Sequence, residues 1–380
     1  MMNLLLWLGA VIWILFCSQV MVNRTLARDL SKTKLKSLKN PPSVSIIVPA
    51  RNEERSIREA VSSFCTQDYP LFEVLVVNDQ STDATPQILT ELRTRFSNLK
   101  VIDGRDPPHG WLGKPNALEI GRKEAKGQWL LFVDADVVYA PDLLSRTIAY
   151  VVRQEADMLF LAPNFITKGF MEAVLMSTIY LVAAAAFPLY LATHSKSKHF
   201  AGGGGVFNLV HRDALIACGA FESIKDAVVD DVALGYRVKA AGCRLAGALA
   251  GSLIRIRMYH SASETVEGFT KNIYPLARQL PWLLPIPFVG GLLLTILPYY
   301  AFFDGLLAGF ISVPAVTSLI FMHMVFGCIS FFFEQPWYIA FLNPLREIGW
   351  WWIMMRSLVV YHRKGIVWRG RSYRNKTELH

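Results

Sequence analysis

The sequence predicts an α/β fold, with a Rossmann-like, mostly parallel sheet, joined to transmembrane helices at both ends of the chain. In the middle of the chain, short runs of β-branched residues alternate with helical stretches. Long apolar stretches lie near both ends, and 53% of the 380 residues are hydrophobic. Such a content exceeds that of an ordinary soluble domain, so the composition favours a membrane protein with a globular middle part.

The first 23 residues predict a transmembrane anchor. Residues 3–22 hold no charge and are long enough to cross a bilayer. A cleaved signal peptide has its positive charges before the apolar core, whereas here the basic residues follow it, over 24–39. This order predicts an uncleaved anchor at 1–23, with its carboxyl side in the cytoplasm, followed by a basic juxtamembrane linker at 24–40.

The charges indicate which binding partners to expect, and the cysteines indicate the redox state of the compartment. The net charge is +9, and basic runs near both ends flank apolar segments, which favours contact with anionic lipid. Nucleic-acid binding is not expected, because neither run carries a recognisable nucleic-acid module. The five cysteines are scattered without a C-x-x-C pair, so neither a disulfide framework nor a zinc site is indicated, as suits a reducing compartment.

A globular domain is predicted over residues 41–280. Because strands and helices alternate there, helices should cover both faces of a sheet whose strands carry ligands at their carboxyl ends. Each predicted strand runs into a polar group, which is "PARNEE", "NDQSTD" or "DAD". The strands are expected at 43–50, 72–79 and 127–136, and the helices at 53–66, 84–95 and 115–125.

The chain becomes apolar again after residue 280. Two transmembrane helices are predicted over 281–334, and the second contains His323. An ionisable group inside a membrane is a functional candidate, but a neutral histidine bonded to a backbone carbonyl is the favoured interpretation. Charged residues and three consecutive tryptophans interrupt the next apolar stretch, so residues 335–380 are expected to form an interfacial helix and a basic cytoplasmic tail.

Paired aspartates occur at two places in the globular part. Asp134 and Asp136 follow a hydrophobic strand, and in an extended chain such residues point the same way and can share a divalent cation. Unpaired surface acids at a strand end are the alternative. Asp230 and Asp231 open an amphipathic helix, where acids also serve simply as favourable helix-start residues.

Five ordered stretches cover about residues 43–272, and they read "SIIVPARNEE", "VLVVNDQSTDAT", "GWLGKPNALEIGRKEAKGQWLLFVDADV", "AGGGGVFNLVHRDALIACGAF" and "VDDVALGYRVKAAG". Together they resemble a known family, the inverting nucleotide-sugar glycosyltransferases of family 2, which have a GT-A fold. Three further stretches read "PHGWLGK", "RMYHSASETVEGFTKN" and "IVWRGRSY". These resemble bacterial enzymes that glycosylate membrane lipids such as carotenoids and hopanoids.

The resemblance implies a role for each motif. Asp136, with Asp134 beside it, would hold Mg²⁺ or Mn²⁺ on the donor diphosphate, and Asp231, supported by Asp230, would be the general base. The glycines of the "GGGG" stretch would lie near the acceptor, whereas a flexible loop is the alternative. The residues implied at the nucleotide sugar are Pro49, Glu53, Asp79, Lys114 and Asp134, and those implied in the acceptor region are Gly203, Gly204 and Gly205.

The family's Q-x-x-R-W motif is altered here to "RQLPW", at Arg278–Trp282. Because that motif is linked to polymer synthesis, its loss favours transfer of a single hexose, with UDP-glucose as the expected donor. The expected acceptor is a lipid hydroxyl on a carotenoid or hopanoid. Ceramide, diacylglycerol and polyprenyl phosphate are the alternatives, followed by a polysaccharide synthase and an inactive sugar-nucleotide-binding scaffold.

The apolar segment at 173–192 is about one bilayer long. A single crossing there would place the aspartates of "DAD" and "VDD" on opposite sides of the membrane, although both must reach one sugar. The segment is therefore expected to lie in the membrane interface or to re-enter the membrane from the same side. The resulting localisation is a multi-pass protein of the cell (inner) membrane with a cytoplasmic catalytic domain.

Overall fold

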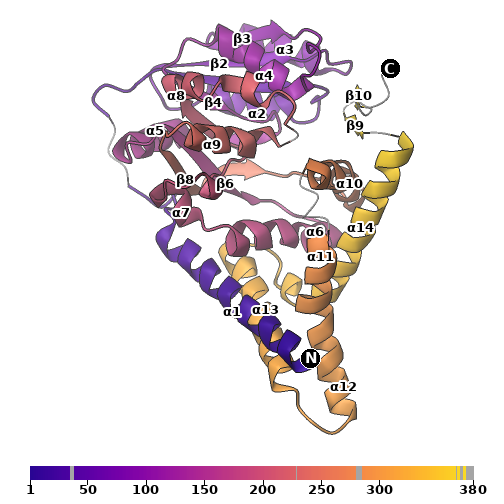
Figure 1. The fold of residues 1–380 in the computed structure, drawn as a ribbon. Coiled ribbons are helices and arrows are strands. Elements are labelled where there is room, and N and C mark those ends of the chain that lie inside the picture. Colours follow the sequence, from indigo (N-terminus) through magenta and orange to yellow (C-terminus); the bar gives the residue numbers. More distant parts are fainter. Residues whose placement is uncertain (35–37, 228, 280–284, 365, 369–370, 374–380) are drawn as a thin grey trace. The chain divides into compact units, whose positions relative to one another are not determined.

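An eight-stranded sheet and a group of long apolar helices belong to two different units of the computed structural model. The structure describes residues 1–34, 38–227, 229–279, 285–364, 366–368 and 371–373. The helical unit comprises Met1–Thr25, Thr167–Pro188 and Tyr259–His380, and the sheet unit comprises Leu26–Ile166 and Leu189–Met258. Most of their elements are labelled in Figure 1.

The sheet has the strand order β3-β2-β1-β4-β7-β6-β8-β5. Neighbouring strands are parallel from β3 to β4 and between β6 and β8, whereas β7 runs antiparallel to β4 and β6, and β5 runs antiparallel to β8. The predicted α/β fold with a mostly parallel sheet is therefore confirmed. The strands are β1 Val44–Ala50, β2 Phe72–Asn78, β3 Leu99–Asp103, β4 Trp129–Phe132, β5 Val137–Tyr139, β6 Met158–Phe165, β7 Asn208–His211 and β8 Leu245–Ile256.

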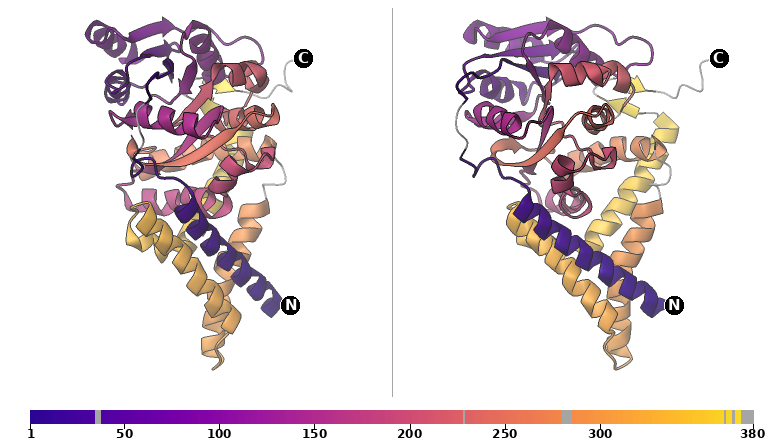
Figure 2. Two further views of the ribbon diagram at one scale, coloured as in Figure 1. Left: turned by 90° about the vertical axis from the view of Figure 1, so that its left-hand side faces the viewer. Right: turned by 60° about the vertical axis from the view of Figure 1, so that its left-hand side comes forward.

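Helices cover both faces of the sheet (Figure 2). Strand side chains alternate between faces, so Val44, Ile46 and Val48 join one buried cluster, while Ile47 packs against Gly121 on the other side. The helices of this unit are α2 Ile57–Cys65, α3 Thr85–Arg95, α4 Gly113–Glu124, α5 Leu143–Arg153, α7 Leu189–His194, α8 Arg212–Ala217 and α9 Asp230–Ala240, with short 3₁₀ helices at Lys198–Phe200 and Ala220–Ile224. The helices predicted near 53–66, 84–95 and 115–125 are confirmed, and the first begins later, at Ile57.

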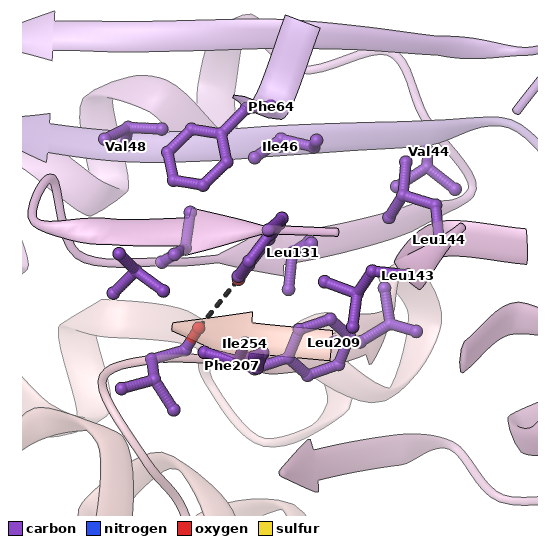
Figure 3. Close-up of a cluster of buried hydrophobic side chains, with 14 of the residues drawn as sticks. Val44, Ile46, Val48, Phe64, Leu131, Leu143, Leu144, Phe207, Leu209 and Ile254 are labelled. Carbon is purple, nitrogen blue, oxygen red and sulfur yellow. Dashed lines mark hydrogen bonds between the residues drawn. The ribbon is translucent and has the colours of Figure 1, made fainter. Parts of the chain in front are cut away.

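The main core of the sheet unit lies between the sheet and the helices α2 and α5. Figure 3 shows apolar side chains from β1, β4, β7 and β8 packed with Phe64 and Leu143. The Tyr139 hydroxyl donates a 2.7 Å hydrogen bond to the carbonyl oxygen of Val206 inside this core. Because a buried hydroxyl is costly without a partner, this bond stabilises the chain where it approaches the ends of β4 and β7.

The helical unit contains three helices that are long and apolar enough to cross a membrane, among the residues described. They span Met2–Leu26, Pro287–Leu307 and Val313–Phe332, and Phe170–Ala185 is a shorter apolar helix. The elements are α1 Met2–Leu26, α6 Phe170–Leu181, a π-helix at Val182–Ala186, α10 Ala262–Gln279, α11 Pro285–Gly290, a π-helix at Gly291–Ile296, α12 Leu297–Leu307, α13 Val313–Phe332, a 3₁₀ helix at Trp337–Ala340, α14 Asn343–Lys364, and the hairpin of β9 Ile366–Trp368 with β10 Arg371–Tyr373.

His323 in α13 contacts a backbone carbonyl and a tyrosine hydroxyl through its two ring nitrogens. Its Nδ1 lies 2.6 Å from the carbonyl oxygen of Ala340, and its Nε2 lies 3.2 Å from the Tyr299 hydroxyl. The predicted bond to a backbone carbonyl is confirmed. In α14, Arg346 is almost fully buried and forms an ion pair with Glu347, as a charge in an apolar bundle requires.

Candidate active site

The candidate site lies where β1, β2 and β4 end at one edge of the sheet. Ala50 is in register with Asn78, and Phe132 is in register with Ile47, so the loops that follow these strands meet at this edge. The backbone N–H of Asp134 donates to the carbonyl oxygen of Gly205, at 2.9 Å. This bond ties the end of β4 to the glycine stretch, although the two are some 70 residues apart in the sequence.

Lys114 connects the two pairs of aspartates. Its Nζ lies 2.8 Å from Asp134 Oδ1 and 3.2 Å from Asp230 Oδ1. Lys114 is in the first turn of α4, and the N–H of Leu112 just before it donates to the carbonyl oxygen of Lys225 at 2.8 Å. The start of α4 is thus fixed against the segment that leads into α9. A small cavity here is lined by Lys114, Leu118, Phe132, Val133, Asp134, Gly205, Asn208 and Asp230.

The electrostatics of this cluster follow from its burial. Burial alone would lower the pKa of Lys114, but Asp134, Asp230 and Asp231 together raise it well above its ordinary value. Burial raises the pKa of Asp230 to about 6, with Lys114 acting in the opposite direction and the neighbouring aspartates reinforcing the rise. Lys114 is therefore a fixed positive charge among carboxylates, and a lysine ammonium group is able to bind phosphate.

Asp231 follows Asp230 in the first turn of α9, as predicted. Its Oδ1 accepts the N–H of Val232 at 2.8 Å, and its side chain is partly exposed. Within the described part of the chain, Asp231 has no cationic side chain at ion-pair distance, unlike Asp230. One acid of the pair is thus held by Lys114 while the other keeps a carboxylate oxygen for a ligand.

Asp136 is partly buried and lies in the turn between β4 and β5. Because residues 135–136 are in a turn, the strand alternation expected to align Asp134 with Asp136 does not operate here. Among the described residues, no three histidine, cysteine, aspartate or glutamate side chains are gathered as metal ligands. Mg²⁺ and Mn²⁺ often take only one or two protein carboxylates beside substrate phosphates, so the donor set of Asp134 and Asp136 fits such a cation.

The loops after β1 and β2 are bound to each other. The N–H of Asn52 donates to Ser81 Oγ at 3.1 Å, and Asn52 Oδ1 accepts the N–H of Thr82 at 2.8 Å. The N–H of Glu53 donates to Thr85 Oγ1 at 2.8 Å. The structure thereby brings Glu53 close to the loop that follows Asp79.

Asp79 itself is buried, and its N–H donates to the carbonyl oxygen of Ala50 at 2.7 Å. Asn78 accepts the N–H of Ser81 through its Oδ1 at 3.3 Å and so closes the turn. Pro49 is partly buried in β1, opposite Val77.

The glycine stretch is closely packed rather than open. A Cβ added to Gly205 would lie 2.3 Å from Asp134 Oδ2, and one added to Gly203 would lie 2.1 Å from the carbonyl oxygen of Asp231. At Gly204 the nearest atom would be 3.4 Å away. The stretch therefore passes between the two pairs of aspartates, and glycine allows this close approach at Gly203 and Gly205.

Sequence reasoning missed Asn208 and Asn52. Asn208 Oδ1 accepts the N–H of Gly204 at 3.2 Å, and a polar residue within the apolar run "VFNLV" was its available signal. Arg255 pairs with Glu59 at the surface. The side chains of Arg278 and Trp282 lie outside the described residues.

Strand-end loops, paired acids and a partly buried lysine at the carboxyl ends of the strands are typical of an α/β enzyme that binds its ligand there. Residues 45–219 match the family model "Glycosyl transferase family 2". Residues 45–219 thus resemble family 2 glycosyltransferases, and this stretch includes Asp79, Lys114 and Asp134.

Over nearly its whole length the chain is also similar to curated glycosyltransferases in sequence and to a solved structure in fold. The chain is 25% identical over 383 residues to "4,4'-diaponeurosporenoate glycosyltransferase" of Staphylococcus aureus (strain bovine RF122 / ET3-1), covering 97% of this chain and 98% of that one. The enzyme of the same name from S. aureus strain N315 is 26% identical over 387 residues, with the same coverage. A mannosyltransferase from Pyrobaculum calidifontis, solved with GDP-Man and Mn²⁺, shares the fold at 16% identity and a TM-score of 0.56, covering 96% of this chain and 99% of that one.

Proposed function

We propose that this glycosyltransferase moves one hexose from a UDP-sugar, with inversion, to a hydroxyl of a membrane lipid. The observation that carries the proposal is the position of Lys114, which lies within 3.2 Å of both Asp134 and Asp230, beside Asp231. A cation for the leaving diphosphate and a carboxylate for the acceptor proton are thereby available at one place. Single transfer is preferred to polymer synthesis because the family's processivity motif is altered.

The donor would lie across the edge formed by β1, β2 and β4. Asp79 would bind the base of the nucleotide, and Glu53 the ribose, with Pro49 beside them. Asp134 would bind the donor as well, and Lys114 would neutralise charge on the phosphates, an interaction strengthened by its partial burial. UDP-glucose is the proposed donor because the sequence resembles family 2 glycosyltransferases. The test of this proposal varies both the nucleotide and the sugar of the donor.

Asp136 and Asp134 would hold a divalent cation, Mg²⁺ or Mn²⁺, on the diphosphate. When bound, the cation supplies Lewis-acid stabilisation of the leaving group. Asp134 follows β4, Asp136 lies in the turn before β5, and the backbone of Asp134 is fixed by Gly205. The protein thus positions the ligands, while the donor's own phosphates would complete the coordination.

Asp231 would be the general base. Its carboxylate takes the proton of the acceptor hydroxyl as the oxygen attacks the anomeric carbon, the bond from that carbon to the diphosphate breaks, and UDP leaves with the electron pair. Attack opposite the leaving group inverts the configuration. Asp230, held by Lys114, supports this group without competing for the same proton.

A membrane lipid is the proposed acceptor, with carotenoid or hopanoid alcohols first. Three helices of sufficient length and hydrophobicity, and the S. aureus relatives of similar length, support this class. The name diaponeurosporenoate denotes a carboxylate, which is already ionised and needs a weaker base than a hydroxyl does. Ceramide and diacylglycerol also react through a neutral hydroxyl, whereas a polyprenyl phosphate is already ionised. The response to loss of Asp231 therefore separates the phosphate acceptor from the hydroxyl acceptors.

The proposed organisation places the protein in the cell membrane. The anchor at 1–23 and the helices at 281–334 would cross the bilayer, while residues 41–280 would form the cytoplasmic catalytic domain with its apolar segment 173–192 at the interface. The linker 24–40 and the part at 335–380 would lie on the cytoplasmic side, where basic residues meet anionic lipid.

The test uses purified full-length protein, labelled UDP- and GDP-sugars, and total membrane lipid, with the product weighed by mass spectrometry. Lipid-dependent UDP release and a product heavier than its lipid by one hexose are expected. The Asp231→Asn variant should lose about 10²- to 10⁴-fold in rate with a hydroxyl acceptor. No release from any donor would favour the inactive scaffold, and a product of many hexoses would favour the polysaccharide synthase.

A further inference from the structure

Lys239, near the end of α9, is a buried lysine that the proposed mechanism does not use. Only 6% of its surface is exposed. Its Nζ donates to the carbonyl oxygens of Ser195, Phe200 and Ser197, at 2.8, 3.3 and 3.5 Å. An ammonium group has three protons, so these three carbonyls match its full donor capacity.

The three carbonyls belong to one short segment, residues 195–203, which leads into the glycine stretch. Thr193, just before it, is bound to β8, because its Oγ1 accepts the N–H of Gly247 at 3.0 Å. Within the segment, Ser195 Oγ accepts the N–H of Ser197 at 3.1 Å. The side chains of Lys196 and Lys198 are exposed, so the segment turns its carbonyls inward to Lys239 and its basic groups outward.

One face of α9 runs along this segment. Asp231, Gly235 and Lys239 are spaced by four residues and therefore lie one above the other on the helix. A Cβ on Gly235 would lie 1.9 Å from the carbonyl oxygen of Gly202, and one on Gly203 would lie 2.1 Å from that of Asp231. No side chain fits between the helix and the segment at these two places.

We infer that Lys239 is a positioning residue for the acceptor: it holds residues 195–203 along the α9 face whose first turn carries Asp231. The inference rests on the proposed function, since it assigns this segment to the acceptor side of the site. Burial lowers the pKa of Lys239, and among the described residues no carboxylate pairs with it, so its interactions are with the segment rather than with an acid. The charge of Lys239 fixes the backbone of residues 195–203, and this backbone determines how the acceptor hydroxyl reaches Asp231.

The experiment compares the full-length wild type with Lys239→Met in detergent micelles. Three quantities are measured: tryptic cleavage after Lys196 and Lys198, UDP release from UDP-glucose without lipid, and UDP release against rising amounts of total membrane lipid. Lys239→Met should speed the cleavage and raise the half-saturating lipid concentration about tenfold, with lipid-free release within about twofold of wild type. Lys123→Met, which removes an exposed lysine of α4, is the matched control and should change none of the three.

The outcomes separate this inference from the proposed function. Lipid-stimulated release in the wild type, with unchanged half-saturation in Lys239→Met, would overturn the inference alone. Absence of lipid stimulation in the wild type would overturn the proposed function and the acceptor role together, whatever the cleavage shows. If Lys239→Met does not fold, Lys239→Arg and Lys239→Gln replace it: the arginine variant, which keeps the charge and its donors, should stay closer to wild-type half-saturation than the glutamine variant, and equal values would refute the role.

Discussion

Substitution of Gly205 by alanine tests whether the position of Asp134 governs donor use. The added Cβ would lie 2.3 Å from Asp134 Oδ2 and 3.2 Å from its Cγ. The backbone of Gly205 is not in the left-handed region, so alanine meets no conformational strain there. The overlap must then be relieved by movement of the Asp134 carboxylate.

The size of that movement follows from the contact distances. To reach an ordinary separation the carboxylate must shift by roughly 1 Å, away from the position at which its Oδ1 meets Lys114 at 2.8 Å. The end of a side chain can move at little cost in folding free energy, but a displacement of about 1 Å at a reacting centre costs about 10²-fold in rate. We therefore expect kcat/KM for UDP-glucose to fall about 10²-fold, equivalent to about 2.7 kcal/mol of transition-state stabilisation.

The assay is UDP release with lipid present, together with thermal unfolding of the same preparations. Gly204→Ala is the matched control, because its nearest atom would be 3.4 Å away, and it should keep activity within about threefold. Both variants should unfold within a few degrees of the wild type. A Gly205→Ala enzyme with wild-type kcat/KM, or an equal loss in Gly204→Ala, would refute the reasoning.

Three further predictions address charge and topology. Lys114→Met should lower the free energy of unfolding by about 3 kcal/mol in urea titrations, because Asp230 then stays buried without its cation, and an unchanged midpoint would contradict the ion pair's role. Burial raises the pKa of Asp230 to about 6, so the folded state keeps a proton that the unfolded chain releases near pH 4. The contribution of Asp230 to the free energy of unfolding therefore falls as the pH rises from about 4 to 6. Asp230→Asn should remove that decline in stability. If the urea midpoints of the variant and of the wild type change equally across this pH range, the prediction is wrong. Cysteines placed at Lys168 and His199 should both be labelled from the cytoplasmic side, and labelling from opposite sides would mean that the segment between them crosses the membrane.

The sequence by itself determined three strands and three helices in the first part of the sheet unit. The runs at 43–50 and 72–79 are continuous and β-branched, and strands buried on both faces of a parallel sheet require such runs. The bond from His323 to a backbone carbonyl was also foreseen, since a lone histidine in an apolar helix has few other partners. Asp230 and Asp231 were placed at a helix start because acids are favourable there.

Only the tertiary structure decided which groups meet. Nothing in the spacing along the chain indicates that Lys114 bridges Asp134 and Asp230, or that Lys239 binds carbonyls some 40 residues before it, because such pairings arise from sheet order and helix packing. The structure also replaced an expected alignment of Asp134 with Asp136 by a turn, since β5 pairs with β8 rather than continuing β4. Local patterns fix what a segment becomes, whereas the neighbours of a side chain depend on contacts between segments distant in sequence, which no periodicity records.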